Sequence, residues 1–390
     1  MVILMNKMIS FNGKFGLERE TFRVTRTGKL AQTSHPFTQQ EFSRDFCENQ
    51  LEIITPVCNS IESAVHSLQT LSKKAQDTLA LQNEKLWMCS NPPHFDDESE
   101  ITIANYTGEQ QGKHQYRLNL ERRYGKKMML FCGIHFNLSF DEETVGENKN
   151  AFYMKLLKYS TKYSWLLTLL TAASPVYDAS FDGVRERKSK LSHYASIRNS
   201  ERGYWNQFIP ILDYTDVQTY CDSIQRYIDK GVLFSEGELY LPVRIKPEGI
   251  NSIKQLSETG VDHIELRMFD LNPLFPEGIA LKDLQFARLL LLYFSLLDDF
   301  DFTEQQQREA IINQKNAAKF DVSNVSINGK NILQKAKELL LEMKDFLGNQ
   351  EESSQIIDYQ INKIVDGKRY AQLILDIQKD NFVETILSLA

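Results

Sequence analysis

The chain has 390 residues, of which 42% are hydrophobic and 11% aromatic, so it holds enough apolar material for a sizeable core. Its 52 acidic and 45 basic side chains give a formal net charge of −7. This balance excludes a broad basic surface, and nucleic acid is therefore not an expected partner.

The cysteines and the apolar runs indicate in which cellular compartment the protein is expected. The five cysteines are odd in number and show no C-x-x-C spacing, which argues against a disulfide framework or a structural zinc site and favours a cytoplasmic location. The opening MVILM is too short for the core of a signal peptide. Apolar runs of about 12 residues at 165–176 and 286–297 fall short of the roughly 20 that a membrane helix needs, so we expect buried helices and no membrane partner.

Strands and helices are mixed in the first part of the chain. Alternating apolar and polar residues predict strands at 15–24, 49–55, 132–140, 239–247 and 261–273. Apolar residues at three-to-four spacing predict a helix over 61–81, with Ser60 as its N-cap beside Ser63 but without a full capping box. A second long helix is expected over 151–173, before Pro175, and a long structured loop over 178–207.

The composition shifts after about Gly278 towards helical patterns. Helices are expected over 279–299, 303–318, 330–347 and 353–388, with a turn or loop at 323–329 and a break near Gly367. We therefore expect a mixed catalytic part over 1–278, which carries an antiparallel sheet, and a helical part over 279–390 packed against it as one compact unit.

Several of these strands repeat one design, because residues two apart on a strand share a face. The polar faces are formed by Glu18 and Glu20; by Glu48, Gln50 and Glu52; by His135, Asn137 and Ser139; and by His263, Glu265 and Arg267. If the strands form one sheet, one side of it carries carboxylates, a histidine and an arginine, with Asp45 at the entrance of a strand. A solvated sheet face is the alternative, since antiparallel sheets often have one wet side.

Carboxylates that face one hollow repel each other and need cations. Magnesium takes a few carboxylates together with waters and phosphate oxygens, and a single histidine suits Mg²⁺ or Mn²⁺ better than a closed zinc site. Arg267 on the same face suits a metal-bound polyphosphate. The sequence contains no phosphate-binding loop of the form G-x-x-x-x-G-K-[ST], so any ATP is expected to bind on the sheet through metals. The residues alone indicate metal-dependent phosphate chemistry without naming a substrate.

A set of longer motifs resembles a known family. FGLERETFRV, GKLAQTSHP, DFCENQLEIITP, GIHFNLSF, SIRNSERGYWN, ELYLPVR and IELRMFDLNPLFPEG occur in the same order as in glutamate–cysteine ligases of the bacterial type and in the ligase module of bifunctional glutathione synthetases. The resemblance covers residues 13 to 280, and the C-terminal helices match only in general character.

The resemblance implies an α+β, glutamine-synthetase-like fold, in which a curved, mostly antiparallel sheet forms a funnel with helices packed outside. It implies an enzyme that uses ATP as co-substrate and Mg²⁺, with Mn²⁺ as the alternative, to join the γ-carboxylate of L-glutamate to the amine of L-cysteine through a γ-glutamyl phosphate. The resemblance implies that the product is γ-glutamylcysteine and that its formation is the first step of glutathione synthesis. A monomer and a small homo-oligomer are both open.

The family's functional positions fall on specific residues of this chain. The metal positions are Glu18, Glu20, Asp45, Glu52, His135 and Glu265. By the same resemblance, Arg267 is expected to contact phosphate and to be catalytic together with Glu265, and Arg198 is expected to bind glutamate. The expected cysteine pocket holds Phe46, Tyr116, Leu120 and Tyr204, and Tyr240 and Arg244 are assigned to nucleotide or phosphate support. Glu48 is not assigned to the metal positions, because it is expected to pair with Arg44.

The chain departs from the family pattern in two places. It reads WMCSNPP where the family usually reads WPLSMP, and CGIHFN where many members read SGIHYN. Such changes leave open a related ligase that joins glutamate to a different amine. No ATP-grasp module follows, so we do not expect a bifunctional glutathione synthetase. The further alternatives are a catalytically inactive copy and a phosphotransferase whose phosphorylated product persists.

Overall fold

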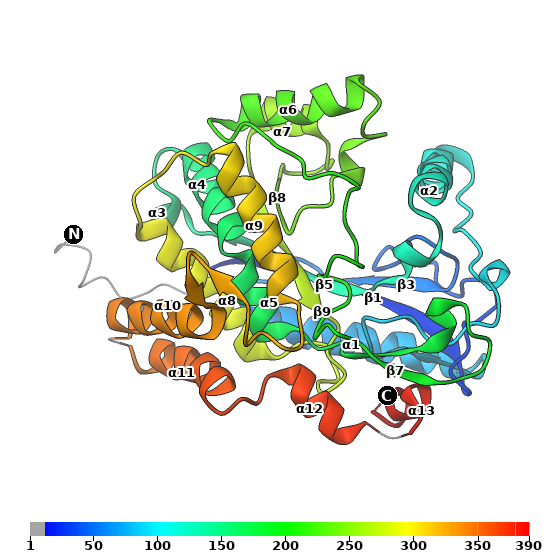
Figure 1. Ribbon diagram of the computed structural model, residues 1–390. Helices are drawn as coiled ribbons and strands as arrows, with labels where there is room; N and C mark the ends of the chain where they lie inside the picture. Colours follow the sequence, from blue (N-terminus) through cyan, green and yellow to red (C-terminus); the bar gives the residue numbers. More distant parts are fainter. Residues whose placement is uncertain (1–11, 349, 379, 390) are drawn as a thin grey trace.

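The computed structural model describes residues 12–348, 350–378 and 380–389 (Figure 1). The opening apolar stretch, on which the signal-peptide expectation rests, lies outside the described residues.

A single seven-stranded sheet organises the molecule, and all of its pairings are antiparallel. Its order is β2-β3-β1-β5-β9-β8, and β4 pairs with the end of β1. The strands are β1 (Gly13–Thr25), β2 (Phe42–Arg44), β3 (Gln50–Ile54), β4 (Glu84–Leu86), β5 (Gly133–Phe140), β8 (Val243–Lys246) and β9 (His263–Asp270). The prediction of an α+β fold with a mostly antiparallel sheet is confirmed.

Helices and two small hairpins complete the described chain. The helices are α1 (Ile61–Ala80), α2 (Gln111–Tyr124), α3 (Glu142–Val145), α4 (Lys149–Lys162), α5 (Ser164–Thr171), α6 (Val217–Asp229), α7 (Ile253–Thr259), α8 (Leu281–Leu296), α9 (Glu304–Ala317), α10 (Ile332–Leu347), α11 (Glu351–Val365), α12 (Tyr370–Ile377) and α13 (Phe382–Leu389). The hairpins pair β6 (Val176–Asp178) with β7 (Ser189–Leu191) and β10 (Ser326–Ile327) with β11 (Lys330–Asn331).

Three sequence expectations differ from the structure in detail. The helix expected over 151–173 is divided at Tyr163, whose backbone leaves helical geometry at φ −106°, into α4 and α5. The helix expected over 353–388 is three helices, α11 to α13. The cap of α1 is a full capping box after all: the Ser63 amide donates to the Ser60 hydroxyl oxygen at 3.1 Å, and the Ser60 amide donates to the Ser63 hydroxyl oxygen at 3.2 Å.

The helices lie mainly on one side of the sheet. Apolar side chains such as Leu51, Ile53, Phe136 and Leu266 form one buried cluster with α1, α4, α5 and α8. In Figure 1, α1 runs along the lower side of the sheet, whereas α2, α6 and α7 stand above it. On the side of the sheet that carries Arg267, a small hollow is lined by Arg198, Tyr204, Tyr240 and Arg267. None of the described helices has both the length and the apolar composition needed to cross a bilayer.

The covered side of β1 also carries two buried arginines, Arg19 and Arg23, which alternate with the glutamates. Arg19 donates to the Ser72 hydroxyl of α1 at 3.2 Å and to the Pro276 carbonyl at 2.9 Å. Arg23 forms an ion pair of 2.9 Å with buried Glu84 in β4. Burial lowers the pKa of Arg19 to about 10. These two residues tie the sheet to its surroundings and lie on the opposite face from Glu18 and Glu20.

Candidate active site

Three strands place Glu18, His135 and Glu265 side by side on the open face of the sheet. Glu18 in β1 is the register partner of His135 in β5, and β5 pairs in turn with β9, which carries Glu265. His135 Nδ1 lies 3.1 Å from Glu18 Oε2 and 3.8 Å from Glu265 Oε1. One ligand atom from each of the three residues falls within 4.8 Å of the others, and we call this set the metal triad.

The other three predicted metal positions lie beside the metal triad but outside it. Glu20 Oε1 is 3.4 Å from His135 Nε2, and its Oε2 accepts the Gly133 amide at 2.9 Å. Glu52 is the register partner of Glu20 in β3, and its Oε2 accepts the Ser43 hydroxyl at 2.7 Å. Asp45 follows β2, and its charge acts on the carboxyl of Glu20. The structure therefore gathers all six predicted positions on one face.

Two arginines close the same hollow. Arg267 in β9 donates to Glu265 Oε2 at 3.1 Å and lies 3.4 Å from His135 Nδ1. Arg198 comes from the loop before α6 and donates to the Arg267 carbonyl at 2.6 Å. A Cβ atom at Gly133 would lie 2.4 Å from the guanidinium carbon of Arg198, so the glycine makes room for this side chain over the strand.

The surroundings shift the pKa values of these carboxyl groups in opposite directions. Burial opposes ionisation of Glu18 and Glu265, but Lys246 and His135 beside Glu18, and Arg267 and Lys246 beside Glu265, outweigh it and hold both pKa values below their usual range. Burial, together with Asp45, raises the pKa of Glu20 to about 8. Burial also raises the pKa of Glu52, which faces Glu18, to about 7.

The histidine follows the same logic. Burial and the nearby Arg267 lower the pKa of His135 to about 4, so the ring is neutral at physiological pH. A neutral imidazole is the form that binds a metal. The donor set, with five carboxylates and one neutral imidazole around a buried face, fits hard divalent cations and has too few cysteines and histidines for a closed zinc site.

The four residues predicted for the cysteine pocket lie in one apolar cluster, together with Tyr240, which was predicted to support the nucleotide or phosphate. Phe46, Leu120 and Tyr240 are buried in one apolar cluster, against which Tyr116 and Tyr204 pack; we call these five residues the aromatic wall. The rings of Tyr204 and Tyr240 lie 4.2 Å apart between centroids. Phe22, two residues after Glu20 on the same face of β1, belongs to the same cluster, so the aromatic wall is continuous with the carboxylates.

Tyr240 and Arg244, which the resemblance groups together, lie in different hollows. Tyr240 lines a small hollow beside Arg198 and Arg267. Arg244 donates to the carbonyls of Gly237 and Leu239 and lines a cavity of about 590 Å³ beside β8, together with Tyr116 and Phe234.

Lys246 and Asp270 were not identified as site residues from the sequence, and Gln50 was placed only on the polar face of its strand. Lys246 is the closest cation to Glu265, with 2.7 Å between Nζ and Oε1. Gln50 donates to Cys132 Sγ at 3.6 Å and accepts the Phe46 amide at 3.2 Å. Asp270 accepts the hydroxyl groups of Ser174 and Ser196, both at 2.8 Å. Lys246 stands two residues after Arg244 on the same face of β8, and that period-two signal was available in the sequence.

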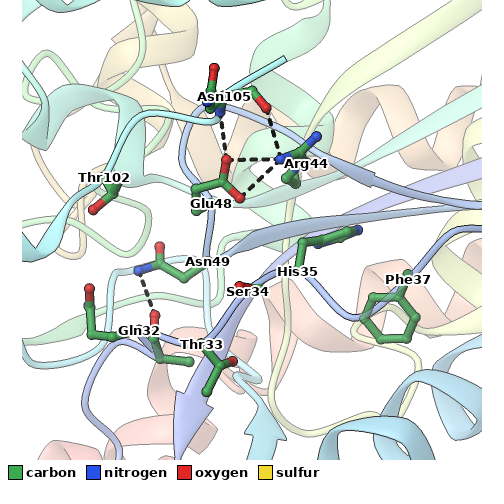
Figure 2. Close-up of a pocket in the computed structure, with 11 residues that line it drawn as sticks. Gln32, Thr33, Ser34, His35, Phe37, Arg44, Glu48, Asn49, Thr102 and Asn105 are labelled. Atoms are coloured by element: carbon green, nitrogen blue, oxygen red, sulfur yellow. Dashed lines mark hydrogen bonds and ion pairs between the residues drawn. The ribbon is translucent and has the colours of Figure 1, made fainter. Parts of the chain in front are cut away.

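A separate polar hollow of about 480 Å³ lies behind the loop that carries Asp45. Figure 2 shows Glu48 held between Arg44 and Asn105: Arg44 Nη1 donates to Glu48 Oε1 at 2.9 Å, and the Asn105 amide donates to the same oxygen at 2.6 Å. The charges of this hollow pair with each other, and none of the predicted site residues lines it. Glu48 is thus the partner of Arg44, as expected.

Cys89, Asn91 and Cys132, which belong to the segments that depart from the family pattern, are buried. Asn91 is buried and donates to the carbonyls of Ser174 and Val176, both at 2.9 Å. Cys89 and Cys132 are buried in the same cluster as the aromatic wall.

The fold and motifs have clear relatives. The sequence model of the family described as glutamate–cysteine ligase matches residues 5–232 and 208–317. A glutathione biosynthesis bifunctional protein GshAB from Listeria monocytogenes is 38% identical over 350 residues, which cover 83% of this chain and 44% of that protein. The chain therefore spans less than half the length of this relative.

Two solved structures share the fold. A glutamate–cysteine ligase from Francisella tularensis in complex with AMP superposes with a TM-score of 0.88 at 24% identity, covering 97% of this chain and 88% of that one. A bifunctional glutathione synthetase from Pasteurella multocida gives a TM-score of 0.82 at 25% identity, covering 97% of this chain and 52% of that one. With the family match spanning most of the chain, the protein belongs to the glutamate–cysteine ligase family.

Proposed function

We propose that this protein joins the γ-carboxylate of L-glutamate to the amine of L-cysteine, with ATP as co-substrate, and releases ADP, phosphate and γ-glutamylcysteine. The observation that carries the proposal is the convergence of Glu18, His135 and Glu265 with Arg198 and Arg267 on one sheet face. That combination of oxygen donors and guanidinium groups suits a reaction in which a phosphoryl group is transferred onto a carboxylate.

The chemistry has two balanced steps. A γ-carboxylate oxygen of glutamate attacks the terminal phosphorus of ATP, the bond to the bridging oxygen breaks, and ADP leaves. The cysteine nitrogen then attacks the acyl carbon, the carbon–oxygen bond to phosphate breaks, and the nitrogen gives up a proton. Phosphorylation makes a poor acyl donor reactive, and both steps move negative charge that the site must stabilise.

Divalent cations are part of the proposal, with Mg²⁺ preferred because the donors are mainly carboxylates and Mn²⁺ as the alternative. Glu18, His135 and Glu265 would hold one ion, and Glu20, Asp45 and Glu52 would complete the set. When bound, such ions supply positive charge to phosphate oxygens.

The arginines have distinct roles in this proposal. Arg267 is catalytic: it is held by Glu265 Oε2 at 3.1 Å, and its guanidinium stabilises charge on the phosphoryl group in transfer. Glu265 orients this arginine as well as offering a metal ligand. Arg198 binds a carboxylate of glutamate, and its position over Gly133 places that substrate beside the metal triad.

The amine acceptor is proposed to lie against the aromatic wall. Tyr116, Tyr204, Phe46 and Leu120 present apolar surface next to the carboxylates, which suits a small side chain such as a thiol-bearing methylene. Burial raises the pKa of Tyr116 to about 12, so its hydroxyl stays protonated and available as a donor.

We place the nucleotide base in the cavity beside β8. Its volume of about 590 Å³ lies in the range of small-molecule pockets, and Ile253, Leu256 and Phe234 give it apolar sides. It adjoins Arg244, the register partner of Glu265, so a base there is one strand away from the metal triad. Phe234→Ala is expected to raise KM for ATP several-fold while leaving KM for glutamate unchanged.

The test is an acceptor panel. Purified protein with ATP, Mg²⁺ and glutamate is given cysteine or other amines and amino acids, and ADP, free phosphate and the γ-glutamyl product are measured. Cysteine is expected to give the highest kcat/KM, with equal amounts of phosphate and dipeptide. A different amine as the best acceptor, or a phosphorylated product that persists, would overturn the proposal.

The buried free thiols, Cys47, Cys89, Cys132 and Cys221, are consistent with a cytoplasmic location, which forms part of the proposal.

A further inference from the structure

Lys246 reaches into the site from the edge strand of the sheet. Its Nζ lies 2.7 Å from Glu265 Oε1 and 3.8 Å from Glu18 Oε1, and only 13% of its side chain is exposed. Both partners belong to the metal triad. The ammonium group therefore touches the two carboxylates that a bound metal ion would use.

The position has an electrostatic reason. Glu18 and Glu265 come together at His135, whose Nδ1 lies 3.1 Å from Glu18 Oε2 and 3.8 Å from Glu265 Oε1, and their side chains are only 20% and 0% exposed. Buried carboxylates need a cation, and without a metal ion Lys246 is the cation that contacts both. Arg267 contacts Glu265 through the other oxygen, Oε2, and does not replace Lys246 at Glu18.

A divalent ion and this ammonium group compete for the same charge. Two cations that share the Glu265 carboxylate repel each other in a partly buried site, where water screens the repulsion weakly. Lysine differs here from arginine, because its single ammonium stands on a flexible four-carbon stem and can move as a unit. Lys246 is the last residue of β8, which is the edge strand of the sheet.

We propose that Lys246 is a resident counter-ion that a divalent metal displaces from Glu18 and Glu265, and that the displaced ammonium then binds a phosphate oxygen of the nucleotide. The second half rests on the proposed function. The first half concerns only this protein and a metal ion. Lys246 thus couples metal binding to nucleotide binding: the ion frees the ammonium, and the phosphate gives it a new partner.

The first experiment measures metal affinity without any substrate. Lys246→Met removes the charge and keeps the length of the side chain, and Lys254→Met, at an exposed lysine of α7, is the matched control. In metal-free protein titrated with Mn²⁺, Lys246→Met is expected to bind the ion at least tenfold more tightly than the wild type. Its Tm without metal is expected to be lower, and saturating Mn²⁺ is expected to close that gap. Unchanged or weaker Mn²⁺ affinity would overturn the proposal.

A second measurement uses the wild type and does not depend on how the variant folds. Acetylation of Lys246 by a lysine-reactive reagent is followed by mass spectrometry in the metal-free protein, with Mn²⁺, and with Mn²⁺ plus a non-hydrolysable ATP analogue. Labelling is expected to rise several-fold with Mn²⁺ and to fall again with the analogue. Labelling that does not respond to Mn²⁺ contradicts displacement, and labelling that rises with Mn²⁺ but ignores the analogue contradicts the phosphate contact.

Displacement of Lys246 by a metal ion can be measured whether or not the protein has the proposed function. Neither the metal titration nor the labelling contains glutamate or an amine, so both remain readable if the protein proves to use another acceptor. Conversely, the acceptor panel identifies the amine from the product that forms and does not report the position of Lys246.

Discussion

Glu18 in β1 lies directly across from His135 in β5, with 3.1 Å between Glu18 Oε2 and His135 Nδ1. Asn137, two residues along β5 on the same face, donates to the other oxygen of Glu18 at 3.0 Å. The carboxylate is therefore held by two side chains of the neighbouring strand, and its orientation towards Glu265 is fixed before any ligand arrives. Such fixed groups stabilise developing charge without the cost of reorganisation.

Glu265→Gln tests the centre of this arrangement. The change removes one charge at nearly constant volume, so Arg267 loses its ion-pair partner and the metal triad loses an anionic donor. We expect kcat to fall about 100-fold or more, the range seen when one fixed polar group is removed from an active site. ADP release with glutamate and cysteine measures the effect.

The control for that variant is Glu258→Gln, at an exposed glutamate of α7 that pairs with Lys254 at 3.9 Å. Exposed pairs of this kind contribute little to stability, so activity should stay at the wild-type level. A Glu265→Gln variant with the same turnover as its control would refute the assignment of Glu265.

Asp270→Asn tests how Arg198 is positioned. Asp270 Oδ1 accepts the Ser196 hydroxyl, and Oδ2 accepts the Ala173 amide at 2.9 Å, which ties the loop of Arg198 to the end of β9. An amide at this position turns a donor towards other donors, at a cost of about 1–3 kcal/mol for a buried group. We expect KM for glutamate to rise about tenfold, a change that corresponds to about 1.4 kcal/mol.

The kinetic pattern distinguishes positioning from general destabilisation. KM for cysteine should change much less than KM for glutamate in Asp270→Asn, because Phe46, Tyr116 and Leu120 of the aromatic wall are carried by other segments. Asp262→Asn, just before the other end of β9 and paired with Lys149 at 3.4 Å, is the matched control. Equal increases in both KM values would show that Asp270 supports the fold rather than the glutamate site.

Much of this arrangement was predictable from the sequence. Period-two alternation identified the shared face of Glu18 and Glu20, and the same rule gave the faces of His135 and Glu265. Which strands are neighbours depends on long-range pairing and not on local pattern. The resemblance implied one mostly antiparallel sheet, whereas the pairing of β1 with β5 and of β5 with β9 is known only from the structure.

Other features were outside the reach of the pattern. Arg19 and Arg23 occupy the covered face of β1, where a rule that places charges outside predicts apolar residues. Their acceptors come from distant segments: Ser72 in α1, the Pro276 carbonyl and Glu84 in β4. The local sequence pattern therefore does not predict these contacts. The break between α4 and α5 was missed for a similar reason, because apolar periodicity continues through Tyr163.

Gln50→Met tests whether Gln50, at the start of β3, holds Phe46 of the aromatic wall in place. The Gln50 amide oxygen accepts the Phe46 amide at 3.2 Å, and its amide nitrogen donates to Cys132 Sγ at 3.6 Å. Methionine fills the space but leaves the Phe46 amide without its acceptor, at a cost of about 1–3 kcal/mol. We expect KM for cysteine to rise about tenfold, since the wall that carries Phe46 loses its anchor.

Cys132→Ser is the matched variant for Gln50→Met. It keeps an acceptor atom for the Gln50 amide, and steady-state kinetics should show KM for cysteine close to the wild-type value. If Gln50→Met also leaves KM for cysteine unchanged, Gln50 does not position the wall.

His35 gives a prediction for stability as a function of pH. Burial, with Arg23 and Arg44 nearby, lowers its pKa from the ordinary value of 6.5 to about 4. Its Nδ1 is buried and has no hydrogen-bond partner among the described residues. The folded protein therefore keeps this ring neutral, whereas the unfolded chain takes up a proton as soon as the pH falls below 6.5.

Because the His35 ring is neutral in the folded protein, the free energy of unfolding depends on pH. Stability that depends on the neutral ring is complete above pH 6.5 and is lost progressively as the pH falls towards 4. His35→Gln removes the titrating group, so its Tm should decline less than that of the wild type between about pH 7 and about pH 4.5. His66→Gln, in α1, is the control and should follow the wild type. Thermal unfolding at several pH values measures the difference, and parallel curves for His35→Gln and the wild type would show that the His35 ring does not titrate as its burial beside two arginines requires.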